Sequence, residues 1–151
     1  MKTGVPIQST AALSINKKIL LQVIYTQNLL HESFSDILKT YDLSPEQFNV
    51  LEILKNQKGK PANMCVIQEK MITKTSNTTR LVDKLLQKGL ATREVCSENR
   101  RKIDVYITTK GLEIIKEVKP FVTNLEEQFV NNLSLNELKN LNFLLKKYRN
   151  T

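Results

Sequence analysis

The fold is decided by residues 63–107, which read NMCVIQEKMITKTSNTTRLVDKLLQKGLATREVCSENRRKIDVYI. The stretch opens with Asn63, a residue type that commonly caps helices, and apolar Val66 and Ile67 follow it at helical spacing. We therefore expect a short helix here, ending in a turn at Ile72-Thr73.

A second helix is expected from about Lys74 to Lys88, closed by Gly89. Its second half supplies apolar side chains for a core, whereas its first two turns are polar throughout. A helix that only packs into the core would not need two polar turns at its start. Polar side chains here can offer donors, acceptors and methyl groups to base edges in a DNA major groove. Those in question are Ser76, Asn77, Thr78, Thr79 and Arg80.

Two short strands are expected next, at residues 90–96 and 103–107, the second with Ile103, Val105 and Ile107 pointing inward. The turn between them ends in Arg100-Arg101-Lys102, which gives the hairpin a basic tip. Cations at this tip can reach phosphates or a narrow minor groove. A short helix, a turn, a polar-fronted helix and a basic hairpin, in this order, predict a winged helix-turn-helix.

Helices flank this stretch on both sides. Ser14 is expected to cap a long first helix that is apolar on more than one face, and the capping box Ser44-Pro45-Glu46-Gln47 starts the next one. Thr108 is expected to cap a long helix kinked at Pro120, and Ser134 opens the capping box of the last helix.

The predicted fold class is therefore mainly α with a small β wing (α+β). We expect one chain over residues 1–151, with a DNA-binding lobe at 44–110 and a helical dimerisation region at 14–41 plus 111–148. The terminal helices have more apolar surface than one compact monomer covers, which favours a homodimer. The expected dimerisation residues are Ile15, Ile19, Val122, Leu125, Phe129, Leu138, Leu141 and Leu145.

The charge of the chain favours a polyanionic partner. Its net charge is +8, and the segment from Lys58 to Lys102 holds eleven basic residues against four acidic ones. We expect the DNA contacts to come from this segment. They are Asn63, Lys74, Thr75, Ser76, Asn77, Thr79, Arg80, Lys84, Arg100, Arg101 and Lys102.

Other functional classes have little support. Cys65 or Cys96 with His31, the single histidine, would be the only conceivable catalytic pair, and the two cysteines fit no metal-ligand spacing. We expect no enzyme activity, no cofactor and no metal site. The opening residues lack a signal peptide and no apolar run reaches the length of a membrane span, which favours a cytoplasmic protein.

Over roughly residues 14–148 the sequence resembles the multiple antibiotic resistance regulator (MarR) family of winged helix-turn-helix transcription regulators. The resemblance rests on the order of three segments: LSPEQFNVL at 43–51, TRLVDKL at 79–85 with KGL at 88–90, and NRR at 99–101 leading into ITTKG at 107–111. It implies an intertwined homodimer on a pseudo-palindromic operator. In the family's Asp-x-Arg wing motif, Arg101 matches the arginine, while Asn99 replaces the aspartate and offers no charge pair.

The resemblance also implies a regulatory role, as a repressor released by a small aromatic or phenolic ligand. A family-style effector pocket would involve His31, Phe34, Tyr41 and Phe48. An alternative of the same fold is a thiol-based redox sensor, with Cys65 or Cys96 as the reactive group, although peroxide-sensing members carry their cysteine at the start of the first helix, where this chain has none. The resemblance names neither the operator nor the ligand.

Overall fold

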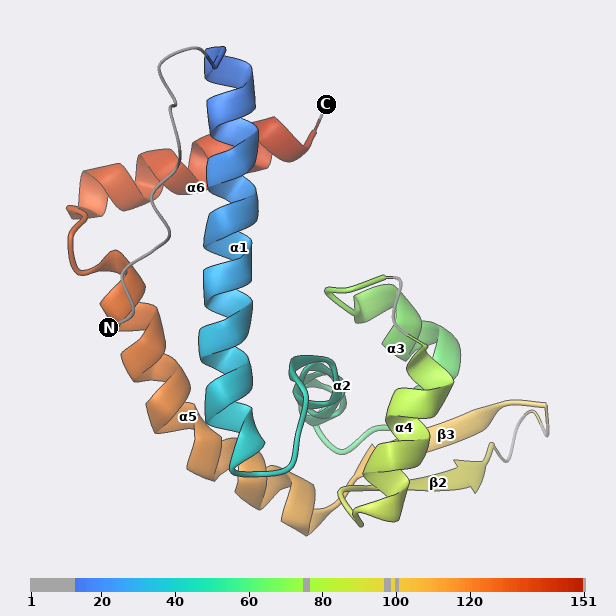
Figure 1. Ribbon diagram of the computed structural model, residues 1–151. Helices are drawn as coiled ribbons and strands as arrows, with labels where there is room; N and C mark the ends of the chain where they lie inside the picture. The colour runs from blue at the N-terminus through green and yellow to red at the C-terminus, as the bar shows by residue number, and fades with distance from the viewer. Residues whose placement is uncertain (1–12, 75–76, 97–98, 100, 151) are drawn as a thin grey trace. The chain divides into compact units, whose positions relative to one another are not determined.

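The structure is a computed structural model that describes residues 13–74, 77–96, 99 and 101–150 (Figure 1). It divides into two compact units, Met1–Ser33 and Phe34–Thr151. Helix α1 (Ile15–Lys39) begins in the first unit and ends in the second. The Ser14 hydroxyl oxygen accepts a hydrogen bond from the Lys17 N–H at 3.4 Å, in agreement with the expected cap.

Helix α2 (Pro45–Asn56) is the central element of the second unit, where it contacts α3, α4, α5 and strand β3. Ser44 and Gln47 form the expected capping box at its start. Its apolar side chains are almost wholly removed from solvent, with Leu51 at 0% and Leu54 at 1% exposure. Because burial of a leucine side chain contributes about 1.5–3 kcal/mol, α2 is the main support of this unit.

Helices α3 (Met64–Lys70) and α4 (Thr78–Gln87) are capped by Asn63 and Asn77. The Asn63 cap was expected from the sequence. The expected start of α4 at Lys74 is wrong, because the helix begins four residues later. Asn77 has an extended backbone and its side-chain oxygen accepts from the Arg80 N–H at 3.1 Å, the interaction that asparagine makes when it starts a helix.

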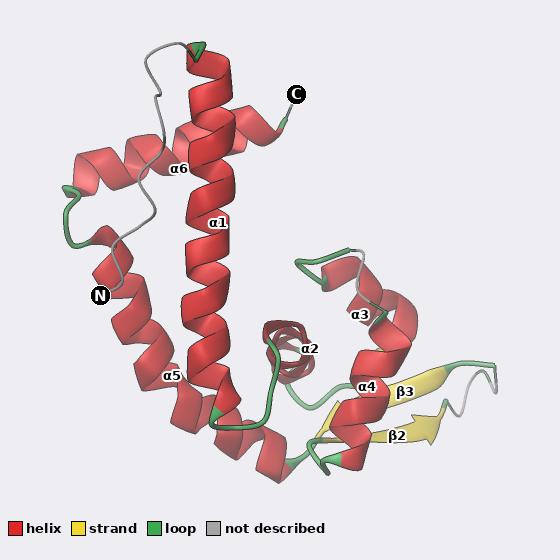
Figure 2. Ribbon diagram, viewed as in Figure 1, coloured by secondary structure: helices red, strands yellow, loops and turns green. Residues whose placement is uncertain are grey.

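The sheet is antiparallel with strand order β1-β3-β2, and Figure 2 labels β2 and β3, the two strands of the hairpin. The hairpin strands β2 (Ala91–Val95) and β3 (Ile103–Ile107) lie close to their expected positions. Strand β1 (Ala62–Asn63) was not expected as a strand, since a strand of two residues leaves no periodic pattern.

One predicted inward side chain of β3 is wrong. Val105 is fully buried, but Ile103 is 41% exposed. Ile103 pairs with Val95, which is 64% exposed, and the pairing with β1 reaches only as far as Asp104. The end of the hairpin therefore extends past the elements that cover its base, so alternation no longer implies burial there.

Helix α5 (Thr109–Val130) continues through Pro120, and α6 (Leu135–Arg149) follows the capping box of Ser134 and Glu137. The start of α5 is joined to the end of α4. The Thr108 hydroxyl accepts from the Gly111 N–H at 3.1 Å and donates to the Gly89 carbonyl at 2.8 Å.

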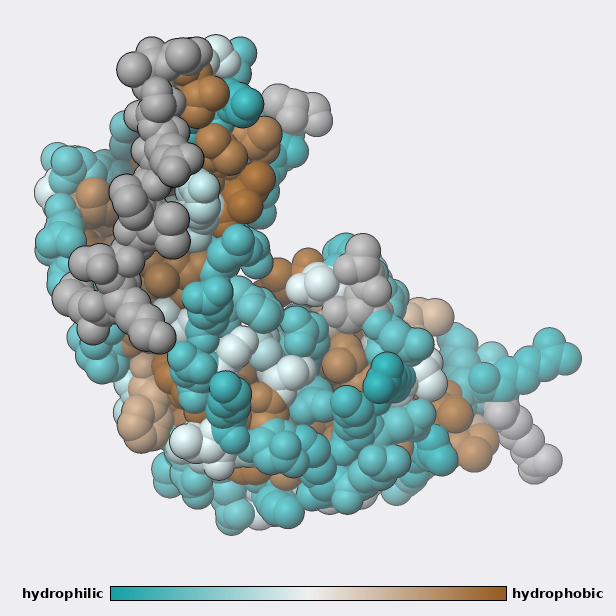
Figure 3. All heavy atoms as spheres, in the orientation of Figure 1, coloured by the Kyte–Doolittle hydropathy of each residue, from teal (hydrophilic) through white to brown (hydrophobic). Residues whose placement is uncertain are grey.

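The terminal helices expose much apolar surface. No residue of α6 is buried, and the exposed fractions reach 67% at Ile15 and 61% at Phe143. Brown, apolar spheres in Figure 3 lie open where Figure 1 draws α1. Among the predicted dimerisation residues, four are exposed and four are half-buried. Ile15, Ile19, Leu141 and Leu145 are exposed, and Val122, Leu125, Phe129 and Leu138 are half-buried.

Candidate nucleic-acid interface

Helix α4 has two chemically different faces. Val82 and Leu85 are buried, whereas Thr79, Arg80 and Lys84 are exposed. The packed face fixes the helix on the lobe, because the buried side chains leave it little freedom to rotate. The exposed face therefore presents a hydroxyl, a guanidinium and an ammonium group from a rigid support.

Thr78 does not belong to the exposed face, contrary to the expectation from the sequence. It is 6% exposed, and its hydroxyl donates a hydrogen bond to the side-chain oxygen of Gln68 on α3. A buried hydroxyl needs such a partner. Thr78 therefore links the two helices, and little of its surface is left exposed.

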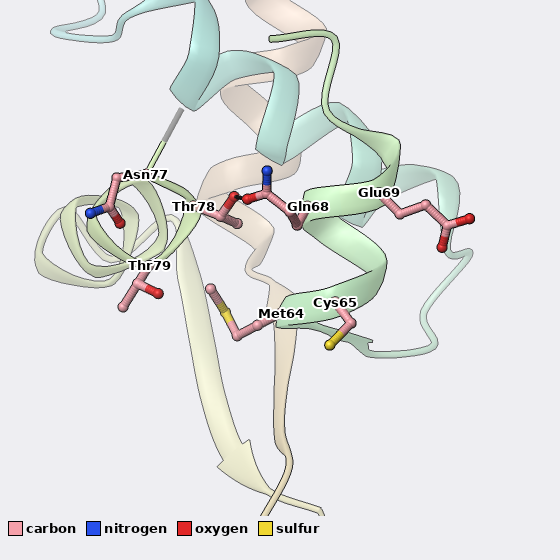
Figure 4. Close-up of a pocket in the computed structure, with 7 residues that line it drawn as sticks. All are labelled: Met64, Cys65, Gln68, Glu69, Asn77, Thr78 and Thr79. Atoms are coloured by element: carbon pink, nitrogen blue, oxygen red, sulfur yellow. Dashed lines mark hydrogen bonds between the residues drawn. The ribbon is translucent and has the colours of Figure 1, made fainter. Parts of the chain in front are cut away.

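A shallow groove of about 560 Å³ lies between α3 and the start of α4 (Figure 4). In the figure, Thr78 and Gln68 meet between the two helices, and Glu69 points away. The residues lining it are Met64, Cys65, Gln68, Glu69, Asn77, Thr78 and Thr79. A second groove, of about 390 Å³, lies between the start of α2 and α4 and is lined in part by Arg80 and Lys84. Asn77 lines both grooves, so the start of α4 can be reached by a binding partner from either groove.

The tip of the β2–β3 hairpin is closed by hydrogen bonds of Asn99. Its side-chain oxygen accepts from the Arg101 N–H at 3.0 Å, and its carbonyl accepts from the Lys102 N–H at 2.8 Å. Asparagine at the position of the family's aspartate thus makes a backbone contact that needs no charge. Arg101 and Lys102 are exposed on this turn.

An ion pair joins the hairpin to α4. The Nη1 atom of Arg93 on β2 lies 3.3 Å from the Oδ1 atom of Asp83 on α4. Both side chains are about half exposed, so the pair contributes little to stability. Sequence reasoning missed it, because neither position stands out in a strand or helix pattern.

Two further predicted DNA-binding residues, Asn63 and Lys74, make hydrogen bonds within the lobe. Asn63 uses its side-chain oxygen to accept from the Val66 N–H at 3.0 Å, and the Lys74 ammonium donates to the Glu69 carbonyl. Thr75, Ser76 and Arg100 lie outside the described residues.

The residues predicted for an effector pocket belong to two units and are described unit by unit. Phe48 is 3% exposed and meets Phe34 edge to face, with ring centroids 5.6 Å apart. Tyr41 is half-buried at the end of α1, and His31 is exposed in the first unit. Phe48 therefore serves the core of the second unit.

The surroundings of two acidic side chains shift their pKa values. Partial burial raises the pKa of the Glu52 carboxyl, with Lys55 opposing and Glu126 reinforcing the shift. Desolvation and the carboxylates of Glu94 and Asp104 raise the pKa of the Tyr106 phenol.

Neither a metal site nor a membrane span is found in the described part of the chain. No three His, Cys, Asp or Glu side chains there gather closely enough to hold a metal ion. None of its helices combines the length and the apolar character that crossing a bilayer requires. Cys65 is an exposed free thiol and Cys96 a half-buried one.

Comparison with known proteins agrees with this geometry. The MarR family model matches residues 43–103. The HTH-type transcriptional regulator MhqR of Bacillus subtilis is 25% identical over 130 residues, which cover 86% of this chain and 88% of the relative. The transcriptional repressor MprA of Escherichia coli is 26% identical over 124 residues, 82% of this chain and 70% of the relative.

Solved structures show the same fold. A MarR transcription factor from Planctomyces limnophilus has a TM-score of 0.70 at 27% identity and covers 89% of this chain and 97% of that one. A mutant of E. coli MarR complexed with operator DNA has a TM-score of 0.76 at 22% identity, covering 90% and 99%. The organohalide-sensing regulator RdhR with 2,4-dichlorophenol has a TM-score of 0.83 at 15% identity, covering 98% and 89%. Residues 43–103 therefore match the MarR family of winged-helix proteins, and the similar proteins named here are transcription regulators.

Proposed function

We propose that this chain is a homodimeric repressor that binds a specific double-stranded DNA sequence and is released by a small ligand. The observation that carries the proposal is the division of α4 into a buried apolar face and an exposed polar one. The exposed side chains, Thr79, Arg80 and Lys84, have the chemistry that reads base edges and neutralises phosphates.

The hairpin supplies the second contact in this proposal. Arg101 and Lys102 would meet phosphates or a minor groove beside the major groove that α4 enters. The pair of Arg93 and Asp83 favours a fixed angle between the two contacts. Asn63, Lys74, Thr75, Ser76, Asn77 and Arg100 remain predicted DNA contacts.

The proposed dimer uses the apolar surface of the terminal helices. Large apolar side chains with open surface are unfavourable in water, and a second copy of the chain covers equivalent surfaces in one two-fold contact. In a two-fold dimer on one face of a duplex, the two copies of α4 lie about 34 Å apart and read half-sites about 10 base pairs apart.

Release by a ligand draws support from named relatives. MprA is a transcriptional repressor, and RdhR was solved with 2,4-dichlorophenol. We propose a small aromatic or phenolic compound as ligand of this chain, with Phe34 and Tyr41 as its nearest aromatic contacts. As a transcription regulator, the protein would work in the cytoplasm.

The test is binding to DNA duplexes at two salt concentrations. A preferred duplex is selected from a random pool with the wild-type chain, and fluorescence anisotropy then compares it with a random duplex of equal length. We expect tighter binding to the selected duplex, weakening with salt in proportion to the phosphates neutralised. A two-half-site footprint is expected, and equal affinity for both duplexes would refute the proposal.

A thiol-based regulator of the same fold is the second candidate. The observation in its favour is the exposed Cys65 on the rim of the groove beside α4, where added bulk would interfere with DNA. Peroxide should then abolish DNA binding by the wild-type chain but spare the Cys65→Ser variant. Equal sensitivity of the two proteins rejects a role for this thiol.

A further inference from the structure

Ile72 and Lys74, which follow α3, are each held by a side-chain amide. The Ile72 N–H donates to the side-chain oxygen of Asn49 on α2 at 3.0 Å. The Lys74 carbonyl accepts from the side-chain amide nitrogen of Gln68 at 2.8 Å. Ile72 itself is 83% exposed, so apolar packing does not fix its place. After the buried Met71, the backbone at Ile72 and Lys74 is therefore held by polar contacts.

Gln68 uses both ends of its side-chain amide. The nitrogen binds the Lys74 carbonyl, and the oxygen accepts from the buried Thr78 hydroxyl, so one side chain of α3 holds the chain on both sides of residues 75–76. Figure 4 shows the second of these contacts. The amide has one preferred orientation, because turning it over would place its oxygen against the Lys74 carbonyl oxygen.

We propose that Gln68 is the positioning residue of the DNA-reading helix. By tying the turn and Thr78 to α3, it fixes the rotation and axial position of the first turn of α4, and with them the side chains of Thr79 and Arg80. This inference rests on the proposed function and adds to it the source of sequence discrimination. Base-edge hydrogen bonds need placement within about 0.5 Å, whereas attraction to phosphates tolerates looser geometry.

The proposal predicts a loss that is selective for sequence. Gln68→Met keeps the length of the side chain without its hydrogen bonds, and Thr78→Val keeps the shape without the hydroxyl. We expect each to weaken binding to the selected duplex about tenfold and binding to a random duplex less than about twofold. Because both variants break one shared contact, the double variant should also lose about tenfold rather than about a hundredfold.

Two further variants separate positioning from other roles. Thr78→Ser restores the hydroxyl and should restore discrimination. Gln57→Met removes an amide at the C-terminal end of α2 that donates to the Ile53 carbonyl of that helix at 3.2 Å, and should leave discrimination unchanged. Thr78 is buried, so a lost contact with DNA would account for little of a loss in Thr78→Val.

Anisotropy titrations on both duplexes and urea unfolding without DNA make the test. Full discrimination by Gln68→Met and Thr78→Val, or equal losses on both duplexes, overturns the role of Gln68. Additive losses in the double variant do the same. A failure of Gln68→Met to fold leaves the comparison of Thr78→Val with Thr78→Ser to decide. If the wild-type chain itself does not distinguish the duplexes, the proposed function fails first.

Discussion

Asn77 combines two roles that substitution can separate. Its side-chain oxygen caps α4 by accepting from the Arg80 N–H, and the residue lies exposed on the surface that we propose to face DNA. Replacing it with alanine removes the cap and any base contact together. Replacing it with serine removes the amide but keeps a cap, because serine and asparagine are about equally good at this position.

The expected magnitudes follow from these two contacts. Loss of the cap in Asn77→Ala should lower the free energy of unfolding by about 1 kcal/mol, whereas Asn77→Ser should leave it nearly unchanged. An amide contact to a base edge is worth about 1–3 kcal/mol, so both variants should bind the selected duplex roughly 5- to 150-fold more weakly. Binding to random DNA should change little.

Urea unfolding without DNA and anisotropy titrations on the selected and random duplexes give both quantities. The decisive comparison is between serine and alanine. If Asn77→Ser binds the selected duplex as tightly as wild type, Asn77 acts only as a helix cap. If either variant loses equal affinity on both duplexes, the assignment of base reading to this residue is wrong.

Four other predictions concern the wing, the assembly and stability. Arg101→Ala should weaken binding to selected and random duplexes alike and reduce the slope of log affinity against log salt by about one unit, and a change in base preference alone would contradict this. Light scattering at micromolar concentration should give about twice the 17.4 kDa chain mass, and a stable monomer would remove the two-half-site arrangement. Gly111→Ala should destabilise the fold by about 1–3 kcal/mol in urea unfolding, since its Cβ would lie 2.5 Å from the Leu90 carbonyl oxygen; wild-type stability would show that this joint relaxes. Hydrogen bonds from the Ser134 hydroxyl and N–H lower the pKa of Glu137, so their contribution should be present above the ordinary carboxyl pKa and lost as pH falls through the lowered one; Ser134→Ala should remove the hydroxyl's larger share of this acid dependence of unfolding and leave the share of the N–H, and an unchanged acid profile would contradict it.

The sequence predicted elements best where local chemistry decides them. The caps at Ser44, Asn63, Thr108 and Ser134 are confirmed, because each needs only a suitable side chain and the backbone N–H groups that follow it. The order of the short helices and the hairpin is also confirmed. Residues 63–107 contain the turn residues and the apolar spacings that local rules describe.

The misses depend on tertiary contacts. Thr78 has the same polar character as its neighbours, and only the position of Gln68 on another helix makes it a buried residue. Ile103 follows the alternation of its strand, but no element covers that end of the hairpin among the described residues. The pair of Arg93 and Asp83 likewise joins elements whose relative placement no single segment determines.

The hydrogen bonds around Thr108 connect the start of α5 to the end of α4, so a movement of one helix is passed to the other. Besides the hydroxyl bonds described above, the Thr108 N–H donates to the Leu90 carbonyl at 3.1 Å, and the Lys110 ammonium donates to the Lys88 carbonyl at 3.1 Å. The 22 residues of α5 span about 33 Å, so a tilt of about 5° about Thr108 moves the far end of the helix by about 3 Å. In the opposite direction, a shift of about 3 Å at the far end of α5 would rotate the helix by only about 5° at Thr108, where it is bonded to the end of α4.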